Sequence, residues 1–275
     1  MKFHWPTNMP FATVNSHEIH FVDTYDTEPQ RGNGKPSILM IHGLGSSSNY
    51  YMPIIPYLTS YRCVALDTYG AALSKSPGER LTLEQLAEDV VGLMDHLHLE
   101  KPVLVGHSMG GTMVCTIAAT HPDRILGIVC IGPVNPASVN ASAFQTRIDT
   151  VSRSGMEPLA DSIPTSATGS ETTPLQRALI RELIIGQDPK SYASHCRVIM
   201  DMQEPKDGFG AVTCPALILA GEEDKSAPLE GCRFIHDHLG SSRKELEVLQ
   251  GVGHWHCVEA GEKVAELIGA FCSSL

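Results

Sequence analysis

Clusters of lysine and arginine are missing from this chain of 275 residues. It has 20 basic and 31 acidic residues, and its formal net charge is −11. Proteins that bind nucleic-acid phosphates or anionic membrane surfaces need clustered basic side chains. We therefore expect neither a nucleic acid nor a membrane as a partner.

Long apolar runs are missing as well. No run is long enough to span a bilayer, and residues 1–10 lack the apolar stretch of a signal peptide. The eight cysteines are scattered, contain no C-x-x-C pair, and include several in apolar runs that look like strands. This distribution is typical of buried free thiols in a reducing compartment, so we expect a cytoplasmic protein.

Metal-binding spacings are the third absence. The 13 histidines include no H-x-x-x-H or H-E-x-x-H pattern. We therefore expect no metal and no cofactor, and any catalytic chemistry must come from the side chains.

What the sequence does contain is a regular alternation of strands and helices. Short runs that are apolar throughout are typical of strands buried on both faces, and alternating strands and helices indicate parallel βαβ units. The chain opens with a predicted hairpin of residues 12–14 and 19–25. Buried strands follow at 37–41, 62–66, 102–105 and 125–131, with helices at 83–97 and 108–120.

The alternation breaks in the second half of the chain. Between residues 132 and 211 we predict only helices, and then the alternation resumes. We interpret residues 132–211 as a helical cap inserted into a core domain of residues 1–131 and 212–275. The predicted cap helices are 143–154, 175–185 and 191–201, and the later core elements are strand 216–220, helix 228–239, strand 246–249 and helix 259–271.

The strongest chemical motif is a G-x-S-x-G sequence at residues 106–110, centred on Ser108. It lies where a predicted buried strand turns into a helix. On such a strained turn the flanking positions must lack side chains, and the serine hydroxyl projects above the sheet edge. We predict that Ser108 is a nucleophile.

A serine hydroxyl needs a base to remove its proton. His254 follows the last predicted strand in a glycine-rich loop of residues 251–253, which can bring its imidazole to the same sheet edge. His256 is the main rival for this role. His107 adjoins the nucleophile in sequence, but on a tight turn its side chain should point away, so we expect it to pack.

The base in turn needs a carboxylate to hold its tautomer and to stabilise the imidazolium. Asp224 follows the strand predicted at 216–220 and precedes the next helix, so it reaches the same edge. Glu222 and Glu223 are the alternatives.

Two backbone N–H groups must stabilise the oxyanion of the tetrahedral intermediate. We predict the amides of Leu44, in a His-Gly-Leu-Gly loop at residues 42–45, and of Met109, directly after the nucleophile. We expect His42 to be structural.

With these motifs in place, the chain resembles the α/β-hydrolase family: residues 42–45, residues 106–110, Asp224 and His254 follow the family's order along almost the whole chain. The resemblance implies an α/β-hydrolase fold, with a mostly parallel eight-stranded sheet flanked by helices and an inserted helical cap.

Within this family, two parts of the insertion, residues 147–161 and 192–196, are similar to the cap of 3-oxoadipate enol-lactonases and their fungal relatives. This similarity implies a small carboxylated enol-lactone as the substrate class.

The leading functional hypothesis is a cofactor-free serine hydrolase that cleaves a small carboxylic ester or lactone through an acyl-enzyme. Two alternatives stay open: hydrolysis of a carbon–carbon bond in a diketone-type substrate, and a ligand receptor that keeps the hydrolase pocket. The candidate substrate-contacting residues are Gly43, Arg147, Ile185, Met200 and Trp255.

Overall fold

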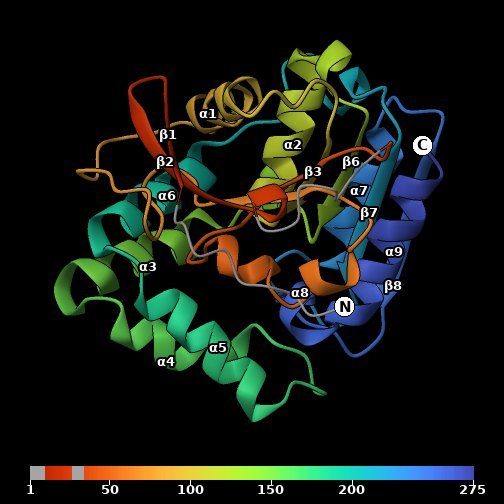
Figure 1. Cartoon of the computed structure of the whole chain (residues 1–275). Helices are drawn as coiled ribbons and strands as arrows, with labels where there is room; N and C mark the ends of the chain where they lie inside the picture. The colour runs from red at the N-terminus through yellow and green to blue at the C-terminus, as the bar shows by residue number, and fades with distance from the viewer. Residues whose placement is uncertain (1–9, 27–33) are drawn as a thin grey trace.

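One sheet of eight strands organises the protein (Figure 1). The computed structural model describes residues 10–26 and 34–275; residues 1–9, where a signal peptide would begin, lie outside the described residues. The strand order is β1-β2-β4-β3-β5-β6-β7-β8. Every neighbouring pair from β4 to β8 is parallel, and β2 runs antiparallel to both of its neighbours. The predicted mostly parallel α/β sheet is therefore confirmed. The strands are β1 (Phe11–Val14), β2 (His17–Asp23), β3 (Ile38–Ile41), β4 (Cys63–Leu66), β5 (Val103–His107), β6 (Gly127–Ile131), β7 (Ala216–Gly221) and β8 (Lys244–Leu249).

The first two strands form the predicted hairpin. Val14 pairs with His17, which leaves Asn15 and Ser16 as a two-residue turn with φ angles of 49° and 70°. Positive φ at both positions is the geometry whose twist matches that of the flanking strands.

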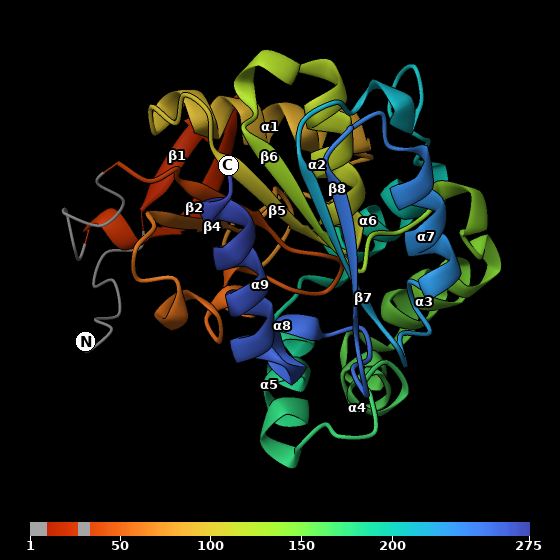
Figure 2. The same ribbon diagram turned by 90° about the vertical axis from the view of Figure 1, so that its right-hand side faces the viewer.

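Helices cover both faces of the sheet (Figure 2). Alternate residues of β3 belong to different apolar clusters: Leu39 and Ile41 pack in one, and Ile38 and Met40 in the other. Because successive side chains of a strand point to opposite faces, a strand covered on both sides must be apolar throughout. The first cluster includes residues of α1 (Leu83–His96), α2 (Met109–Thr120) and α7 (Leu229–His238), and the second includes residues of α8 (His256–Glu259) and α9 (Gly261–Ser273).

The last helix differs from its prediction. Instead of one helix over 259–271, the chain forms the short α8 and then α9, separated at Ala260, whose φ and ψ are −134° and 44°. The helical backbone is interrupted at this residue, although the apolar pattern of the sequence continues across it.

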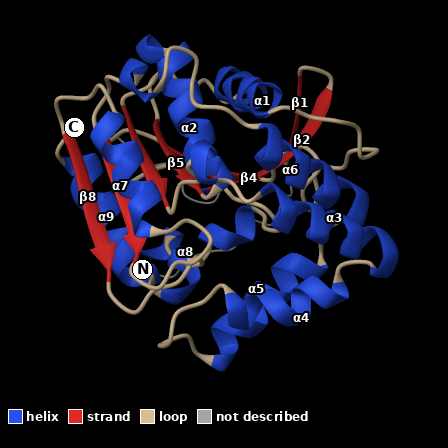
Figure 3. Ribbon diagram, turned by 180° about the vertical axis from the view of Figure 1, so that it is seen from behind, coloured by secondary structure: helices blue, strands red, loops and turns tan. Residues whose placement is uncertain are grey.

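Four helices lie between β6 and β7 in the sequence, beyond the end of the sheet (Figure 3). Helix α3 packs on α6, and α4 packs on α5. We did not predict α4, which carries Pro164 in its interior. We propose that the cap comprises residues 132–211. The helices are α3 (Ala141–Ser154), α4 (Glu157–Ser166), α5 (Pro174–Ile185) and α6 (Pro189–Asp201).

Within the described residues, no helix combines the length and apolar character needed to cross a membrane.

Candidate active site

Ser108 lies on a sharp turn between β5 and α2, with φ and ψ of 56° and −118°. A Cβ atom at Gly106 would lie 2.0 Å from the carbonyl oxygen of Gly110, and one at Gly110 would lie 2.4 Å from that of Ile41. Real Cβ atoms do not approach so closely, so both positions of the motif require glycine. The turn holds Ser108 in a conformation that non-glycine residues adopt rarely and at a cost in backbone strain.

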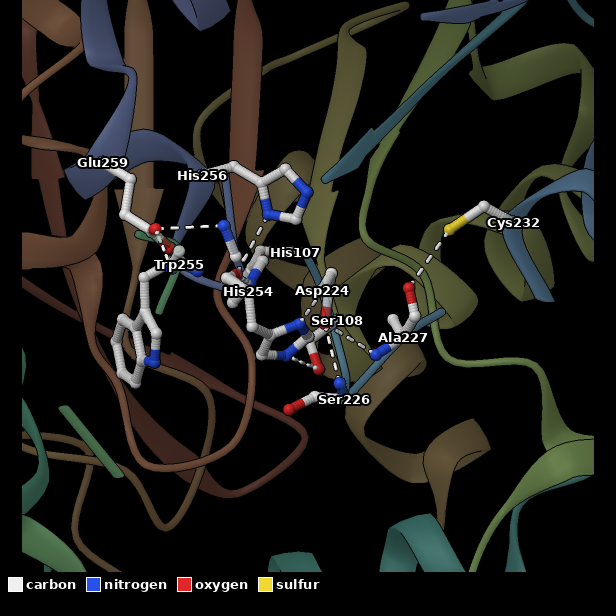
Figure 4. Close-up of polar contacts among 12 residues, drawn as sticks. His107, Ser108, Asp224, Ser226, Ala227, Cys232, His254, Trp255, His256 and Glu259 are labelled. Carbon is white, nitrogen blue, oxygen red and sulfur yellow. Dashed lines mark hydrogen bonds and ion pairs between the residues drawn. The ribbon is translucent and has the colours of Figure 1, made fainter. Parts of the chain in front are cut away.

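His254 and Asp224 complete a hydrogen-bonded chain with this serine (Figure 4). The Nε2 atom of His254 lies 3.0 Å from Oγ of Ser108, and its Nδ1 atom lies 2.8 Å from Oδ2 of Asp224. All three residues are buried, with exposed fractions of 5% to 9%. The fold thus brings together a hydroxyl, an imidazole and a carboxylate from distant parts of the chain. The imidazole is 146 positions from the serine and 30 positions from the aspartate.

Asp224 is held as a carboxylate. Burial acts to raise its pKa, but the attraction and the hydrogen bond from His254, with smaller contributions from His256 and the backbone of Ala227, together outweigh burial, and the pKa lies below its usual range. Its Oδ1 atom also accepts hydrogen bonds from the backbone N–H groups of Ser226 and Ala227, at 2.8 and 2.9 Å. An anionic Asp224 favours the tautomer of His254 with the proton on Nδ1, which leaves the Nε2 lone pair directed at Ser108.

The two rival carboxylates bind loops instead. Glu222 accepts a hydrogen bond from the backbone of Gly251, and Glu223 accepts two from Ser170.

The two rival histidines support the backbone of His254. Nε2 of His107 and Nδ1 of His256 each lie within hydrogen-bonding distance of the carbonyl oxygen of His254, at 2.8 and 2.9 Å. Both rings must donate to this carbonyl, and burial lowers the pKa of both, which favours the neutral form of each donor ring. His107 also stacks on the ring of Tyr50 at 4.2 Å, in agreement with the predicted packing role.

The loop after β3 lies directly against the serine. A Cβ atom at Gly43 would lie 2.7 Å from Cβ of Ser108, so glycine is needed for this approach. Leu44 and Ser108 line the same cavity, and Met109 is the first residue of α2. The first N–H groups of a helix have no intrahelical partner and carry partial positive charge. Met109 therefore has a backbone N–H without an intrahelical partner next to the serine, and Leu44 lies at the cavity that contains Ser108.

His42, in the same loop, has a structural environment, as predicted. Its Nδ1 atom donates to the carbonyl oxygen of Gly43 at 2.7 Å, and its Nε2 atom accepts from the backbone of Thr68 at 3.1 Å. Burial lowers its pKa, which keeps the ring neutral.

A cavity of about 300 Å³ opens above Ser108, and its lining contains two cations, Arg147 and Lys225, and no acidic side chain. The ion pairs of described arginines involve Arg62, Arg80, Arg124 and Arg181, and that of a described lysine involves Lys263. Neither cation of the cavity forms an ion pair with a described carboxylate, although Glu223 is close enough to Lys225 for the lysine to lower the pKa of that carboxyl. Arg147 lies over the ring of Phe144, at 5.2 Å from its centroid.

A smaller cavity of about 30 Å³ adjoins His254 and is lined by Arg147 and Trp255 among others. Trp255 is 3% exposed, and its indole N–H has no hydrogen-bond partner among the described residues. A larger hollow of about 780 Å³, between α5 and the loops at 47–53 and 72–75, contains none of the three residues of the hydrogen-bonded chain.

The predicted substrate-contacting residues fall into two groups. Arg147 and Trp255 line cavities that contain Ser108 or His254, and Gly43 contacts Ser108 itself. Ile185 and Met200 line neither of these cavities; instead Ile184 lines the cavity of about 30 Å³ and Ile199 lines the cavity of about 300 Å³ above Ser108. On a helix, one residue of offset rotates a side chain by about 100°, so a shift of one position decides which face it occupies.

Sequence reasoning missed Lys225 as a cavity residue. Its position directly after Asp224 was the available signal, because a residue next to the acid starts at the same sheet edge.

No group of three or more His, Cys, Asp or Glu side chains is placed to hold a metal ion within residues 10–26 and 34–275.

Comparison with known proteins finds similarity to hydrolases in both sequence and structure. A family model described as "alpha/beta hydrolase fold" matches residues 36–260. The 3-oxoadipate enol-lactonase 2 of Acinetobacter baylyi is 26% identical over 244 residues, which cover 84% of this chain and 90% of that protein. The 2-hydroxymuconate semialdehyde hydrolase of a Pseudomonas species is 27% identical over 257 residues, covering 87% of each protein. The crystal structure of the enol-lactonase from Burkholderia xenovorans superimposes with a TM-score of 0.85 at 25% identity, covering 96% of this chain and 100% of that chain.

Proposed function

Because the chain belongs to the α/β-hydrolase fold family, we propose that it is a cofactor-free serine hydrolase that cleaves a small carboxylic ester or lactone. The observation that carries the proposal is the hydrogen-bonded chain from Ser108 through His254 to Asp224, at 3.0 and 2.8 Å. A hydroxyl, a base and an orienting carboxylate in this arrangement are the requirements of nucleophilic acyl transfer.

In the first half of the reaction, Oγ of Ser108 attacks the substrate carbonyl while Nε2 of His254 takes its proton. Asp224 stabilises the imidazolium that forms. The amides of Leu44 and Met109 stabilise the oxyanion of the tetrahedral intermediate. When this intermediate collapses, the carbon–oxygen bond breaks and His254 returns the proton to the leaving oxygen.

In the second half, a water molecule attacks the acyl group on Ser108, again with His254 as the base. The products are a carboxylic acid and the free serine. With a lactone, the leaving hydroxyl stays attached to the acyl group, so a cavity of about 300 Å³ needs no separate space for a second product.

We further propose that the substrate carries a carboxylate, which Arg147 and Lys225 bind. Two cations without acidic neighbours in the lining support this choice in a chain whose net charge is −11. The unpartnered indole N–H of Trp255 provides a further donor for a substrate oxygen beside His254. The relative named 3-oxoadipate enol-lactonase 2 supports the lactone within this class.

The test is a panel of p-nitrophenyl acetate, a neutral lactone and an enol-lactone with a free carboxylate. The proteins are wild type, Ser108→Ala, Arg147→Gln and Arg153→Gln, the last an exposed arginine on the same helix α3 as a matched control. We expect Ser108→Ala to lose turnover of every member. We expect Arg147→Gln to raise KM for the carboxylated lactone by about tenfold or more, as for the loss of a charge-assisted hydrogen bond, and to leave the neutral compounds unaffected.

Equal KM values in the two arginine variants would contradict the carboxylate assignment alone. Failure of the wild type on all members would instead favour hydrolysis of a carbon–carbon bond or a receptor. Full turnover by Ser108→Ala would overturn the proposed mechanism.

A further inference from the structure

Glu259, the last residue of α8, binds the backbone on both sides of His254 (Figure 4). Its Oε1 atom accepts a hydrogen bond from the N–H of Trp255 at 2.8 Å, and its Oε2 atom accepts one from the N–H of Gly253 at 3.0 Å. The residues before and after the candidate base are therefore attached to one carboxylate.

The same carboxylate also binds the connection between α4 and α5. Oε2 of Glu259 accepts from the N–H of Gly169 at 2.7 Å and from Oγ1 of Thr172 at 2.8 Å. The backbone N–H of His254 donates to the carbonyl oxygen of Ala167 in this connection, at 2.9 Å. One carboxylate thus joins the loop of the base to a segment about 90 positions away in the chain.

The two segments are packed without space between them. A Cβ atom at Gly253 would lie 2.5 Å from the backbone nitrogen of Gly169, and one at Gly169 would lie 2.1 Å from the carbonyl oxygen of Gly251. Small movements of the loop are therefore blocked on this side, and Glu259 holds it there.

Local helix capping does not explain this arrangement. Capping would account for the bond to Trp255, four positions before Glu259 and next to the start of α8. It would not account for the bonds to Gly169 and Thr172, which are 90 and 87 positions away. No described lysine, arginine or histidine forms an ion pair with Glu259, and its two carboxylate oxygens accept hydrogen bonds from four N–H and O–H donors.

We propose that Glu259 is a positioning residue for catalysis. It fixes the backbone around His254 against the α4–α5 connection, so that the imidazole stays within hydrogen-bonding distance of both Ser108 and Asp224. The proposal rests on the proposed function of Ser108 and His254. A base displaced by about 1 Å loses on the order of a hundredfold in rate, although the fold around it is intact.

The test replaces the carboxylate by its isosteric amide. Glu259→Gln has only one acceptor oxygen, and its NH₂ group faces N–H donors. Glu262→Gln, an exposed glutamate on α9, is the matched control. Two rates are measured on protein whose thermal unfolding shows that it is folded at the assay temperature. They are kcat for p-nitrophenyl acetate, determined together with KM, and the rate at which a fluorophosphonate labels Ser108 covalently. Labelling joins Oγ to phosphorus, releases fluoride and transfers the serine proton to His254, so it reports on the base without any assumption about the natural substrate.

We expect Glu259→Gln to lower kcat and the labelling rate by about 10- to 100-fold, with KM within about twofold of wild type, and Glu262→Gln to change neither rate. A folded Glu259→Gln protein with both rates within about twofold of the control would overturn the proposal, as would a loss confined to KM.

Thr172→Val decides the question if Glu259→Gln does not fold. It removes one of the four donors and keeps the shape of the side chain, so we expect both rates to fall by about threefold, an effect the size of one hydrogen bond. Unchanged rates would overturn the proposal.

Ser108→Ala separates the positioning role of Glu259 from the proposed function of Ser108 and His254. If Ser108→Ala is inactive and unlabelled while Glu259→Gln behaves as wild type, only the positioning role fails. If Ser108→Ala is still labelled at the wild-type rate, the proposed function fails first.

Discussion

At the scale of single residues, the partner of each buried histidine determines what that histidine can do. The ring of His254 binds a carboxylate and a hydroxyl, whereas the rings of His107 and His256 donate to a carbonyl oxygen. His195, on α6, likewise donates from Nε2 to the carbonyl oxygen of Tyr69 at 2.8 Å. Burial lowers the pKa of His107, His195 and His256, so these rings serve as neutral cross-links of the fold.

The pH dependence of stability follows from these rings. Burial lowers the pKa of His195 from 6.5 to about 4, so between these values the unfolded chain binds a proton that the native protein does not. The free energy of unfolding therefore rises with pH across this window. As the pH falls through it, the protein loses up to about 3 kcal/mol of stability for a pKa shift of this size.

Urea unfolding of wild type, His195→Gln and the exposed His96→Gln at several pH values from 5 to 8 checks this expectation. The free energy of unfolding of His195→Gln should depend less steeply on pH below about 6.5 than that of the other two proteins. Identical slopes in all three would contradict the assignment of His195 as a neutral buried ring.

Some residues of the candidate site could be predicted from the local sequence, and others could not because their role depends on contacts with distant segments. Ser108, Asp224 and His254 each lie in the turn or loop that follows a predicted strand, and strand ends of a parallel sheet meet at one edge, so their proximity could be predicted from the sequence. The role of Glu259 depends on Gly169 and Thr172, and no local pattern indicates that those segments meet.

At the scale of elements, the register of the parallel strands determines which loops lie side by side at the candidate site. Gly106 of β5 pairs with Ile41 of β3, so the loop after β3 begins beside the turn that contains Ser108. The strands β3 to β7 could be predicted because burial on both faces makes them apolar. The start of β8 differs from its prediction: it begins at Lys244 rather than at Leu246, because an edge strand has a partly exposed face that accepts charged residues.

The approach of the loop after β3 to Ser108, the proposed nucleophile, can be tested by adding one methyl group. Gly43→Ala places a Cβ atom 2.7 Å from that of Ser108, so the loop must move away and take the amide of Leu44 with it. We expect kcat for p-nitrophenyl acetate to fall by about 100-fold, the usual consequence of losing one oxyanion donor.

Gly269→Ala, in the interior of α9, is the control. Its Cβ atom would meet its nearest neighbour, Cδ2 of Leu58, at 3.7 Å, which is ordinary van der Waals contact. Alanine favours the helix over glycine by about 1 kcal/mol, so this variant should keep full activity and gain about 2–4 °C in Tm. An active Gly43→Ala protein would show that the loop does not supply the donor.

At the scale of the whole molecule, the connection between α4 and α5 helps to assemble the site. Ser170 in this connection donates to Glu223, next to Asp224, while Gly169 donates to Glu259, near His254. One segment between β6 and β7 is thus attached to both loops that hold His254 and Asp224, the proposed base and its carboxylate. Sequence periodicity predicted helices in this region, but α4 was missed because prolines obscured its pattern.

The charge distribution supports the same account. The chain as a whole carries a net charge of −11, yet the cavity above Ser108 is lined by two cations and no acid. A cationic cavity in an acidic protein attracts anionic ligands locally, and salt weakens this attraction.

The most direct test of the central claim is intact-mass spectrometry of wild type and Ser108→Ala, quenched with acid within the first turnovers of p-nitrophenyl acetate. We predict an acetyl adduct on the wild-type protein that maps to the peptide containing Ser108, a matching burst of p-nitrophenol, and neither adduct nor turnover in Ser108→Ala. Steady turnover by Ser108→Ala, or a wild-type adduct that maps to another residue, would contradict the account.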